Sequence, residues 1–107
     1  MEQIVDAEKK VLTLRLRGDL TSGNTASAQA IAALLQAARD EGRPWRNVEL
    51  DLREARMVDS VGLNMIVAVF KSTQRGGGRL RLNYSDANVH RTFVFTRLDQ
   101  HLDLVKV

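Results

Sequence analysis

Several common features are missing from this sequence of 107 residues, and each absence excludes a class of protein. There is no cysteine, which excludes disulfides, thiol nucleophiles and cysteine–zinc sites. No apolar run approaches the roughly 18–20 residues of a membrane-spanning helix, so we expect no membrane insertion. The first ten residues contain acids and no apolar core, which argues against a signal peptide. The expected location is therefore the cytoplasm.

Aromatic residues are also scarce, at 5% of the chain, and this bears on how the charge is interpreted. Lysine and arginine number 16 against 13 acidic residues, so the formal net charge is +3 and the isoelectric point is about 9.8. Such a basic chain raises nucleic acid as a partner. Nucleic acids are often bound by aromatic side chains interleaved with cations, and no such pattern is present. We therefore expect no direct nucleic-acid binding.

The hydrophobic and charged fractions, 44% and 27%, are those of a globular protein, and the length suits one domain over residues 1–107. Leu12, Leu14 and Leu16 alternate with polar residues, which predicts a strand over residues 11–17. Similar signals predict further strands near residues 4–5, 45–52 and 79–83, a final strand or extended tail over residues 102–107, and helices over residues 25–41, 60–75 and 86–96. Strands that alternate with helices indicate an α/β fold, here with a mixed, mostly parallel sheet of four to five strands.

Three of the predicted strands carry charge at alternate positions, whereas a parallel strand buried on both faces would be apolar on both. We therefore expect helices mainly on one face of the sheet. The outward charges are Arg15 and Arg17, Glu49 and Asp51, and Arg79 and Arg81. If the acidic strand lies between the two basic strands, these side chains form a cross-strand ladder in which each pair contributes about 0.2–1 kcal/mol. This ladder is the preferred account of much of the arginine content, and a basic face for nucleic acid is the alternative.

The residues that usually carry chemistry do not form a recognisable site. The glycines at 76–78 lack the spacing of a phosphate-binding loop and follow a helix instead of preceding one. His90 and His101 are the only histidines, and neither has the spacing of a metal ligand. Ser60, His90 and Asp103 can be drawn as a triad, but no glycine-flanked nucleophile turn supports it. We expect neither an enzyme nor a metal or cofactor site.

The most informative stretch is MVDSVGLN at residues 57–64, which leads into the predicted helix over residues 60–75. That helix is apolar on most sides, so we expect it to be largely buried. Asp59 or Ser60 suits its N-cap, but Gly62 costs about 1 kcal/mol relative to alanine inside a helix. The glycine makes sense if another backbone or a partner approaches closely. A serine at a helix N-terminus is also well placed to carry phosphate, because the helix dipole favours the added negative charge.

DSVGL at residues 59–63 resembles the Asp-Ser-Ser/Thr-Gly-Leu signature of the STAS domain family, whose small members include bacterial anti-sigma factor antagonists. The likeness covers nearly the whole chain, with further matches to the segment after the second strand at residues 16–20, to the strand before the signature at residues 48–52, and to the C-terminal helix and turn at residues 88–99. Two positions depart from the family pattern. Val61 replaces the second hydroxyl of the signature, and Thr21 stands where the family often has an acid.

The resemblance implies a partner-switching regulator and not a catalyst. In such systems the unphosphorylated antagonist binds and sequesters a serine kinase, often an anti-sigma factor. The kinase phosphorylates the signature serine to release the antagonist, and a PP2C-type phosphatase restores it. The matching serine here is Ser60, which is the expected phosphoacceptor. The expected kinase-docking surface comprises Asp59, Val61, Gly62, Leu63 and Asn64, together with Thr21 and Ser22 of a neighbouring loop.

Two other functions stay open at this point. The first is a STAS subunit that is not phosphorylated and serves in assembly, such as the small STAS component of a lipid-transport ABC complex docked on its ATPase. The serine of the signature favours the antagonist, while the basic charge is compatible with the assembly subunit. Nucleic-acid binding is a distant third.

Overall fold

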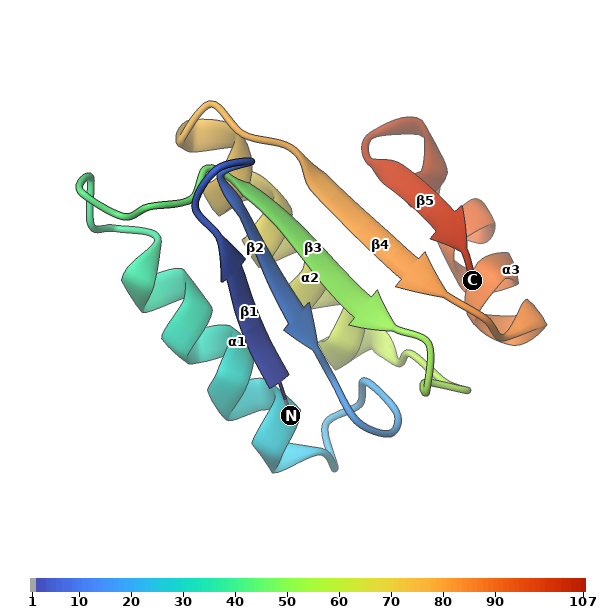
Figure 1. Cartoon of the computed structure of the whole chain (residues 1–107). Coiled ribbons are helices and arrows are strands. Elements are labelled where there is room, and N and C mark those ends of the chain that lie inside the picture. The colour runs from blue at the N-terminus through green and yellow to red at the C-terminus, as the bar shows by residue number, and fades with distance from the viewer. Residues whose placement is uncertain (1) are drawn as a thin grey trace.

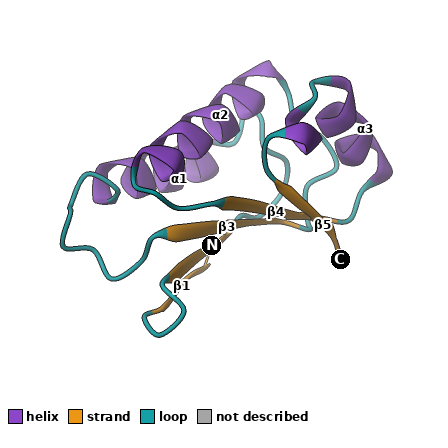
Figure 2. Cartoon of the chain, turned by 90° about the horizontal axis from the view of Figure 1, so that it is seen from above, coloured by secondary structure: helices purple, strands orange, loops and turns teal. Residues whose placement is uncertain are grey.

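A computed structural model describes residues 2–107 and contains a five-stranded sheet with three α-helices packed on one face (Figures 1 and 2). In chain order the elements are β1 (Glu2–Asp6), β2 (Val11–Arg15), α1 (Thr25–Ala37), β3 (Asn47–Leu52), α2 (Ser60–Arg75), β4 (Leu80–Tyr84), α3 (Ala87–Phe95), a 3₁₀ turn η1 (Leu98–Gln100) and β5 (Asp103–Lys106). Among these residues, no helix is long and apolar enough to cross a membrane.

The strands lie in the sheet in the order in which they occur in the chain. β1 pairs with β2 in antiparallel fashion through a short hairpin, and β2, β3, β4 and β5 pair in parallel. Figure 2 shows all three α-helices on the same side of the sheet, with the other side uncovered. The predicted fold class, a mixed and mostly parallel sheet with helices mainly on one face, is confirmed.

The core lies between the sheet and the helices, and the strand register explains how it is filled. The parallel pairing places Leu14 beside Leu50 and Leu50 beside Leu82, so alternate residues of three strands face the helices in continuous rows. Ile66 of α2 and Phe93 of α3 close over these rows and are fully buried. Burying one such side chain contributes about 1.5–3 kcal/mol, so this layer is the main source of stability.

The first helix is shorter than the pattern predicts, because it ends at Ala37 and not near Glu41. Its N-cap is Asn24, whose side chain accepts a hydrogen bond from the Ser27 amide at 3.1 Å. At the other end, the Asp40 carboxylate accepts a hydrogen bond from the Gly42 amide at 2.9 Å. An aspartate that binds the backbone two residues ahead favours a turn over a helix, which accounts for the early end.

The second helix is less buried than its apolar composition predicts. Only Gly62, Ile66, Val69 and Thr73 of α2 are buried, and Val61 is 40% exposed. The reason is the single layer of helices: α2 has the sheet on one side and α1 beside it, but nothing covers its outer face (Figure 2). The expectation of a largely buried helix is therefore wrong, and the exposed apolar residues at its start require another explanation.

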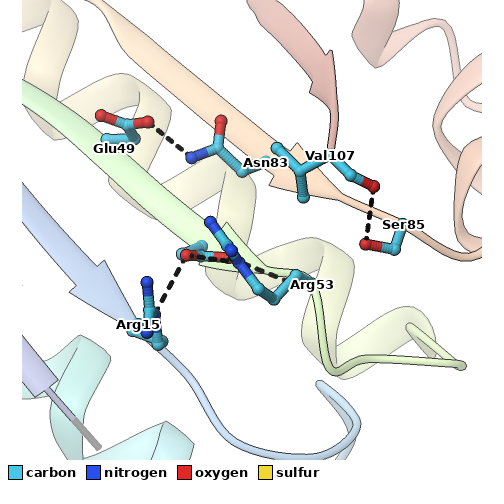
Figure 3. A network of polar contacts seen from close by, with 7 residues as sticks. Arg15, Glu49, Arg53, Asn83, Ser85 and Val107 are labelled. Atoms are coloured by element: carbon cyan, nitrogen blue, oxygen red, sulfur yellow. Dashed lines mark hydrogen bonds and ion pairs between the residues drawn. The ribbon is translucent and has the colours of Figure 1, made fainter.

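The uncovered face of the sheet carries an ion-pair cluster on Asp51 (Figure 3). Asp51 is only 1% exposed, because the guanidinium groups of Arg15 and Arg53 lie against its carboxylate at 3.1 and 3.0 Å. Burial raises the pKa of Asp51, but the hydrogen bonds from Arg53 and Arg15 outweigh it, so the pKa lies below its ordinary value. Asp51 therefore stays ionised and holds the ends of β2 and β3 together.

The predicted charge ladder forms only in part. The acidic strand β3 does lie between the two basic strands, and the Arg15–Asp51 pair is present. Arg81 stands opposite Glu49 in the register, but Glu49 accepts its hydrogen bond from the Asn83 amide (Figure 3). Arg17 and Arg79 lie just beyond the strands and form no ion pair within residues 2–107. Much of the basic charge therefore remains unpaired.

Candidate functional site

Two loops meet at the carboxyl ends of β2 and β3 (Figure 1). Leu20, in the loop after β2, forms an isolated parallel bridge with Val58, in the loop after β3. The Leu20 amide donates to the Met57 carbonyl at 3.1 Å, and the Asp59 amide donates to the Leu20 carbonyl at 3.3 Å. The start of α2 is therefore joined to the first loop through backbone hydrogen bonds, although about 40 residues separate the two in sequence.

Gly62 is required by this junction. A Cβ atom added at Gly62 would lie 2.1 Å from the Leu20 carbonyl oxygen, a separation that no pair of atoms without a bond adopts. The sequence analysis anticipated the close approach of another backbone or of a partner, and here that neighbour is the Leu20 backbone. Gly62 is buried, so it serves the predicted docking surface by allowing the two loops to meet.

Asp59 caps α2 and also holds the neighbouring loop. One carboxylate oxygen accepts a hydrogen bond from the Gly62 amide at 2.8 Å, and the other accepts from the Ser22 amide at 3.0 Å. The pKa of Asp59 lies below its ordinary value because these two backbone amides donate hydrogen bonds to its carboxylate, and the bond from Gly62 has the larger effect. The carboxylate of the signature aspartate thus links the Ser22 amide to the first turn of the helix that begins at Ser60. We call this pair of hydrogen bonds the Asp59 clamp.

Two polar residues that the sequence analysis assigned no role in the site complete the junction. The Asp19 carboxylate accepts hydrogen bonds from the amides of Arg56 at 2.8 Å and Met57 at 3.2 Å. The side-chain amide of Asn24 donates to the carbonyls of Arg17 and Asp19 at 2.9 and 2.8 Å. Sequence offers one signal for each: an aspartate directly after a strand, and an asparagine that also caps the next helix.

Ser60 is the first residue of α2, and its side chain is exposed. Its hydroxyl has no hydrogen-bond partner within the described part of the chain. Apolar side chains surround this position at the surface, since Met57 is 58% exposed and Val61 is 40% exposed. Leu63 and Asn64 follow on the same helix, half-buried and exposed respectively.

The apolar surface continues from α2 onto α3. Leu63 lines a shallow, mostly apolar depression together with Val94 and Phe95. Phe95 is 89% exposed at the end of α3, which is unusual for a large aromatic side chain with no partner in the fold. Sequence reasoning treated this segment as part of a helix only. The sequence signal that could have identified this surface is the pair of bulky apolar residues, Val94 and Phe95, at the end of a short helix.

Two of the three residues that could be drawn as a catalytic triad, His90 and Asp103, have other places in the structure. The ring nitrogen Nδ1 of His90 is hydrogen-bonded to the hydroxyl of Tyr84, and the two rings stack with centroids 5.3 Å apart. Asp103 lies at the start of β5 on the edge of the sheet. Over residues 2–107, there is also no group of three or more histidine, aspartate or glutamate residues placed to hold a metal ion.

With this geometry established, comparison with known families decides what kind of domain carries it. The model of the STAS domain family matches residues 3–106, which is nearly the entire chain. The chain belongs to the STAS domain family. The Asp59–Leu63 signature in this STAS domain therefore occupies its expected place, between the strand β3 and the helix α2.

Solved structures show the same fold at low sequence identity. TM1081 of Thermotoga maritima, a candidate anti-sigma factor antagonist, matches with a TM-score of 0.82 and 20% identity, over 99% of this chain and 86% of that protein. The unphosphorylated form of the anti-sigma factor antagonist SpoIIAA gives 0.74 and 18%, over 92% and 81%. An anti-sigma factor antagonist from Mycobacterium paratuberculosis gives 0.74 and 20%, over 97% and 84%. No curated protein matches the sequence. The STAS domain therefore has the fold of the anti-sigma factor antagonists.

Proposed function

We propose that this STAS domain is a partner-switching regulator whose Ser60 is phosphorylated by a serine kinase that it binds. The observation that carries the proposal is the position of Ser60. It is an exposed hydroxyl at the first residue of α2, next to the Asp59 clamp and the exposed apolar side chains of Met57 and Val61. Such an arrangement offers both a surface for a partner and a switch within that surface.

A phosphate on Ser60 would change this surface more than the fold. The N-terminus of α2 favours negative charge, because its free amide groups and its dipole point toward the phosphate. Phosphorylation adds about 1.5 to 2 negative charges at pH 7. Asp59 beside it is already held ionised by its two hydrogen bonds. The apolar surface of the unmodified domain therefore becomes strongly anionic, and a partner docked through apolar contacts is expelled.

The unphosphorylated form is the binding form in this proposal. Its docking surface is the predicted set Asp59, Val61, Leu63 and Asn64 with Thr21 and Ser22, extended to Met57 on one side and to Val94 and Phe95 on the other. Gly62, the remaining residue of the predicted set, lies buried beneath this surface and supports it. The partner is a serine kinase of the anti-sigma factor type, and a PP2C-type phosphatase restores the binding form. Because such kinases use ATP, the proposal places the protein in the cytoplasm, as a substrate and not as an enzyme.

Three observations support control by phosphorylation over a purely structural role. The serine of the signature is retained at position 60, the junction around Asp59 holds it at the surface, and the similar folds include an antagonist named in its unphosphorylated form. Val61 in place of the second hydroxyl leaves Ser60 as the single hydroxyl of the signature. The modification should therefore fall on one residue.

The experiment has two steps. The Ser60→Ala protein is used to recover the kinase from the native cell, since a domain that cannot be phosphorylated should stay bound. The wild-type protein is then incubated with that kinase and ATP, and the phosphate is located by mass spectrometry. Thr25→Ala is the matched control, because Thr25 carries an exposed hydroxyl at the first residue of α1, outside the docking surface.

We expect one phosphate, on Ser60, in both the wild-type and Thr25→Ala proteins, and Ser60→Asp should not bind the kinase. Phosphate on another residue would refute the assignment of Ser60. Recovery of a transporter ATPase in place of a kinase, with no phosphate transferred, would favour the assembly subunit over the partner switch.

A further inference from the structure

A groove runs between α1 and α2 on the outer side of the helix layer. It has a volume of about 680 Å³ and is bounded on one side by the end of α1 and the loop that follows it, and on the other side by one face of α2. Its lining residues are Leu35, Ala38, Arg39, Glu41, Arg43, Asn64, Val67, Ala68, Lys71, Ser72, Arg75 and Gly76. From Asn64 to Gly76, at 1.5 Å per helical residue, the groove is about 18 Å long.

Part of the chain's unpaired basic charge lies in this groove. Four of its lining side chains are cationic, namely Arg39, Arg43, Lys71 and Arg75, and one is acidic, Glu41. They leave three net positive charges, which equals the net charge of the whole chain. The groove is therefore a strongly basic patch on the helix layer.

The negative ends of the helix dipoles do not neutralise all the positive charge of these cations. The carboxyl ends of α1 and α2 lie at the same end of the molecule (Figure 1). Each helix end is equivalent to about half a negative charge, so together they offset only about one of the three positive charges. All the ion pairs found within residues 2–107 go to Asp51, on the other side of the sheet. About two positive charges in the groove are thus left without a counter-charge.

Arg43 shows that part of this charge is held in place. Its guanidinium group lies over the ring of Trp45, 5.0 Å from the centroid, and donates a hydrogen bond to the Asp40 carbonyl at 3.1 Å. A Cβ on Gly76 would lie 2.2 Å from a guanidinium nitrogen, so the glycine leaves room for Arg43 to cross the end of α2. Arg43 is therefore positioned before any partner arrives, which lowers the entropy cost of binding.

The floor of the groove is apolar and the groove is open along its length. Leu35, Ala38, Val67 and Ala68 form this floor between the two rows of charge. Sites for small molecules usually enclose most of the ligand, and an open trough between α2 and the end of α1 with its following loop does not. An amphipathic helix fits such a trough, since its apolar face can lie on the floor while its acidic flanks meet the cationic rims.

We infer that the α1/α2 groove is a second docking surface, which binds an acidic amphipathic helical segment of a partner protein. The length of about 18 Å corresponds to roughly 12 residues of helix. Most of the cationic side chains lie near Gly76, at the end of α2 remote from Ser60. The inference rests on the charge and shape of the groove, and it stands whether or not Ser60 is phosphorylated.

The test uses a synthetic 14-residue helical peptide, with leucines spaced three and four apart on one face and glutamates on the flanks. Its binding to the isotope-labelled full chain is followed by NMR, and the shifted amides are mapped. The variant is Arg39→Glu with Lys71→Glu, which reverses one exposed cation on each side of the groove. The matched control is Lys9→Glu with Lys106→Glu, which makes the same change in net charge at exposed positions outside the groove.

We expect the shifts to map to the groove, the groove variant to bind at least tenfold more weakly, and the control variant to bind within about twofold of wild type. A peptide with glutamine in place of each glutamate should also bind at least tenfold more weakly. Equal losses in the two variants, or shifts that map elsewhere, would overturn the inference. Tighter binding in the groove by tripolyphosphate or by a single-stranded oligonucleotide would show that phosphate, and not an acidic helix, is its ligand. Thermal unfolding of each variant verifies that the fold is retained.

Discussion

The carbonyl oxygen of Leu20 lies directly against the Cα of Gly62, so closely that a Cβ there would be 2.1 Å away. The contact joins the loop after β2 to the first turn of α2, which is where Ser60 is presented. Asp59 secures the same junction through its bonds to the Gly62 and Ser22 amides. The surface around Ser60 is therefore built by two segments that hold each other in place.

Replacing Gly62 with alanine should destabilise the domain by about 1–3 kcal/mol, because the added methyl group must push the Leu20 backbone aside. Chemical denaturation measures the free energy of unfolding. The control is Gly23→Ala, since a Cβ at Gly23 would meet only the Thr21 hydroxyl, at an ordinary 3.8 Å. That change should fall within about 0.5 kcal/mol of wild type. Equal effects at the two glycines would mean that the Leu20 contact is not what requires Gly62.

Replacing Asp51 with asparagine should destabilise the domain by about 1–3 kcal/mol at neutral pH, since Arg15 and Arg53 lose their charged acceptor. The pKa of Asp51 is lowered in the folded state, so its stabilisation is complete above the ordinary value of 3.8 and is lost as the pH falls through the lower folded value. The difference between wild type and variant should accordingly shrink only below about pH 4. Denaturation at a series of pH values measures it.

Glu54→Gln is the control for that series, because Glu54 is an exposed carboxylate two residues from the strand end and forms no ion pair within residues 2–107. We expect its unfolding free energy to match wild type within about 0.5 kcal/mol at pH 7. An Asp51→Asn protein as stable as wild type at neutral pH would contradict the role assigned to the cluster.

Replacing Asp59 with alanine should loosen the junction on both sides at once. Native-state hydrogen exchange is the suitable measurement, because the amides of Gly62 and Ser22 both donate to this carboxylate. We expect both amides to exchange faster, although they belong to different segments. In the control Asp86→Ala, which removes the cap of α3, faster exchange should be confined to Asn88, Val89 and their helix. Unchanged exchange at Ser22 in Asp59→Ala would show that the clamp is not formed.

Replacing Phe95 with alanine should weaken binding of the kinase recovered with Ser60→Ala by roughly tenfold or more, since exposed aromatic residues dominate many interfaces. Isothermal titration calorimetry measures the dissociation constant. Stability should change by less than about 0.5 kcal/mol, because Phe95 is 89% exposed. Val107→Ala is the control, as Val107 is an exposed apolar residue at the C-terminal edge, outside the docking surface. Wild-type affinity in Phe95→Ala would exclude the end of α3 from the interface.

Local patterns were sufficient to predict most elements, and particular residues show why. The alternation of Leu12, Leu14 and Leu16 predicted β2. Polar capping residues located the starts of all three helices to within one residue, and the structure identifies the caps as Asn24, Asp59 and Asp86. These signals act within a few residues along the chain. The end of α1 was misplaced because the Asp40 turn competes with the helix, and such a competition depends on small energy differences.

The candidate site was predictable in its residues but not in its construction. The signature over residues 59–63 could be recognised in the sequence, and Gly62 could be seen to need a close neighbour. That this neighbour is Leu20, and that Asp19 and Asn24 hold the two loops together, follows only from the pairing of β2 with β3. No spacing along the chain encodes these contacts.

The arrangement of basic charge was likewise determined partly by the sequence and partly by the tertiary structure. Composition determined that the chain carries a net charge of +3, and periodicity determined that several arginines face away from the core. Only the tertiary structure decided that Arg15 and Arg53 share the buried Asp51, while Arg39, Arg43, Lys71 and Arg75 line a groove. The physical reason is range: secondary structure depends on neighbours three or four residues apart, whereas the energy of a charge depends on which distant segments the fold brings beside it.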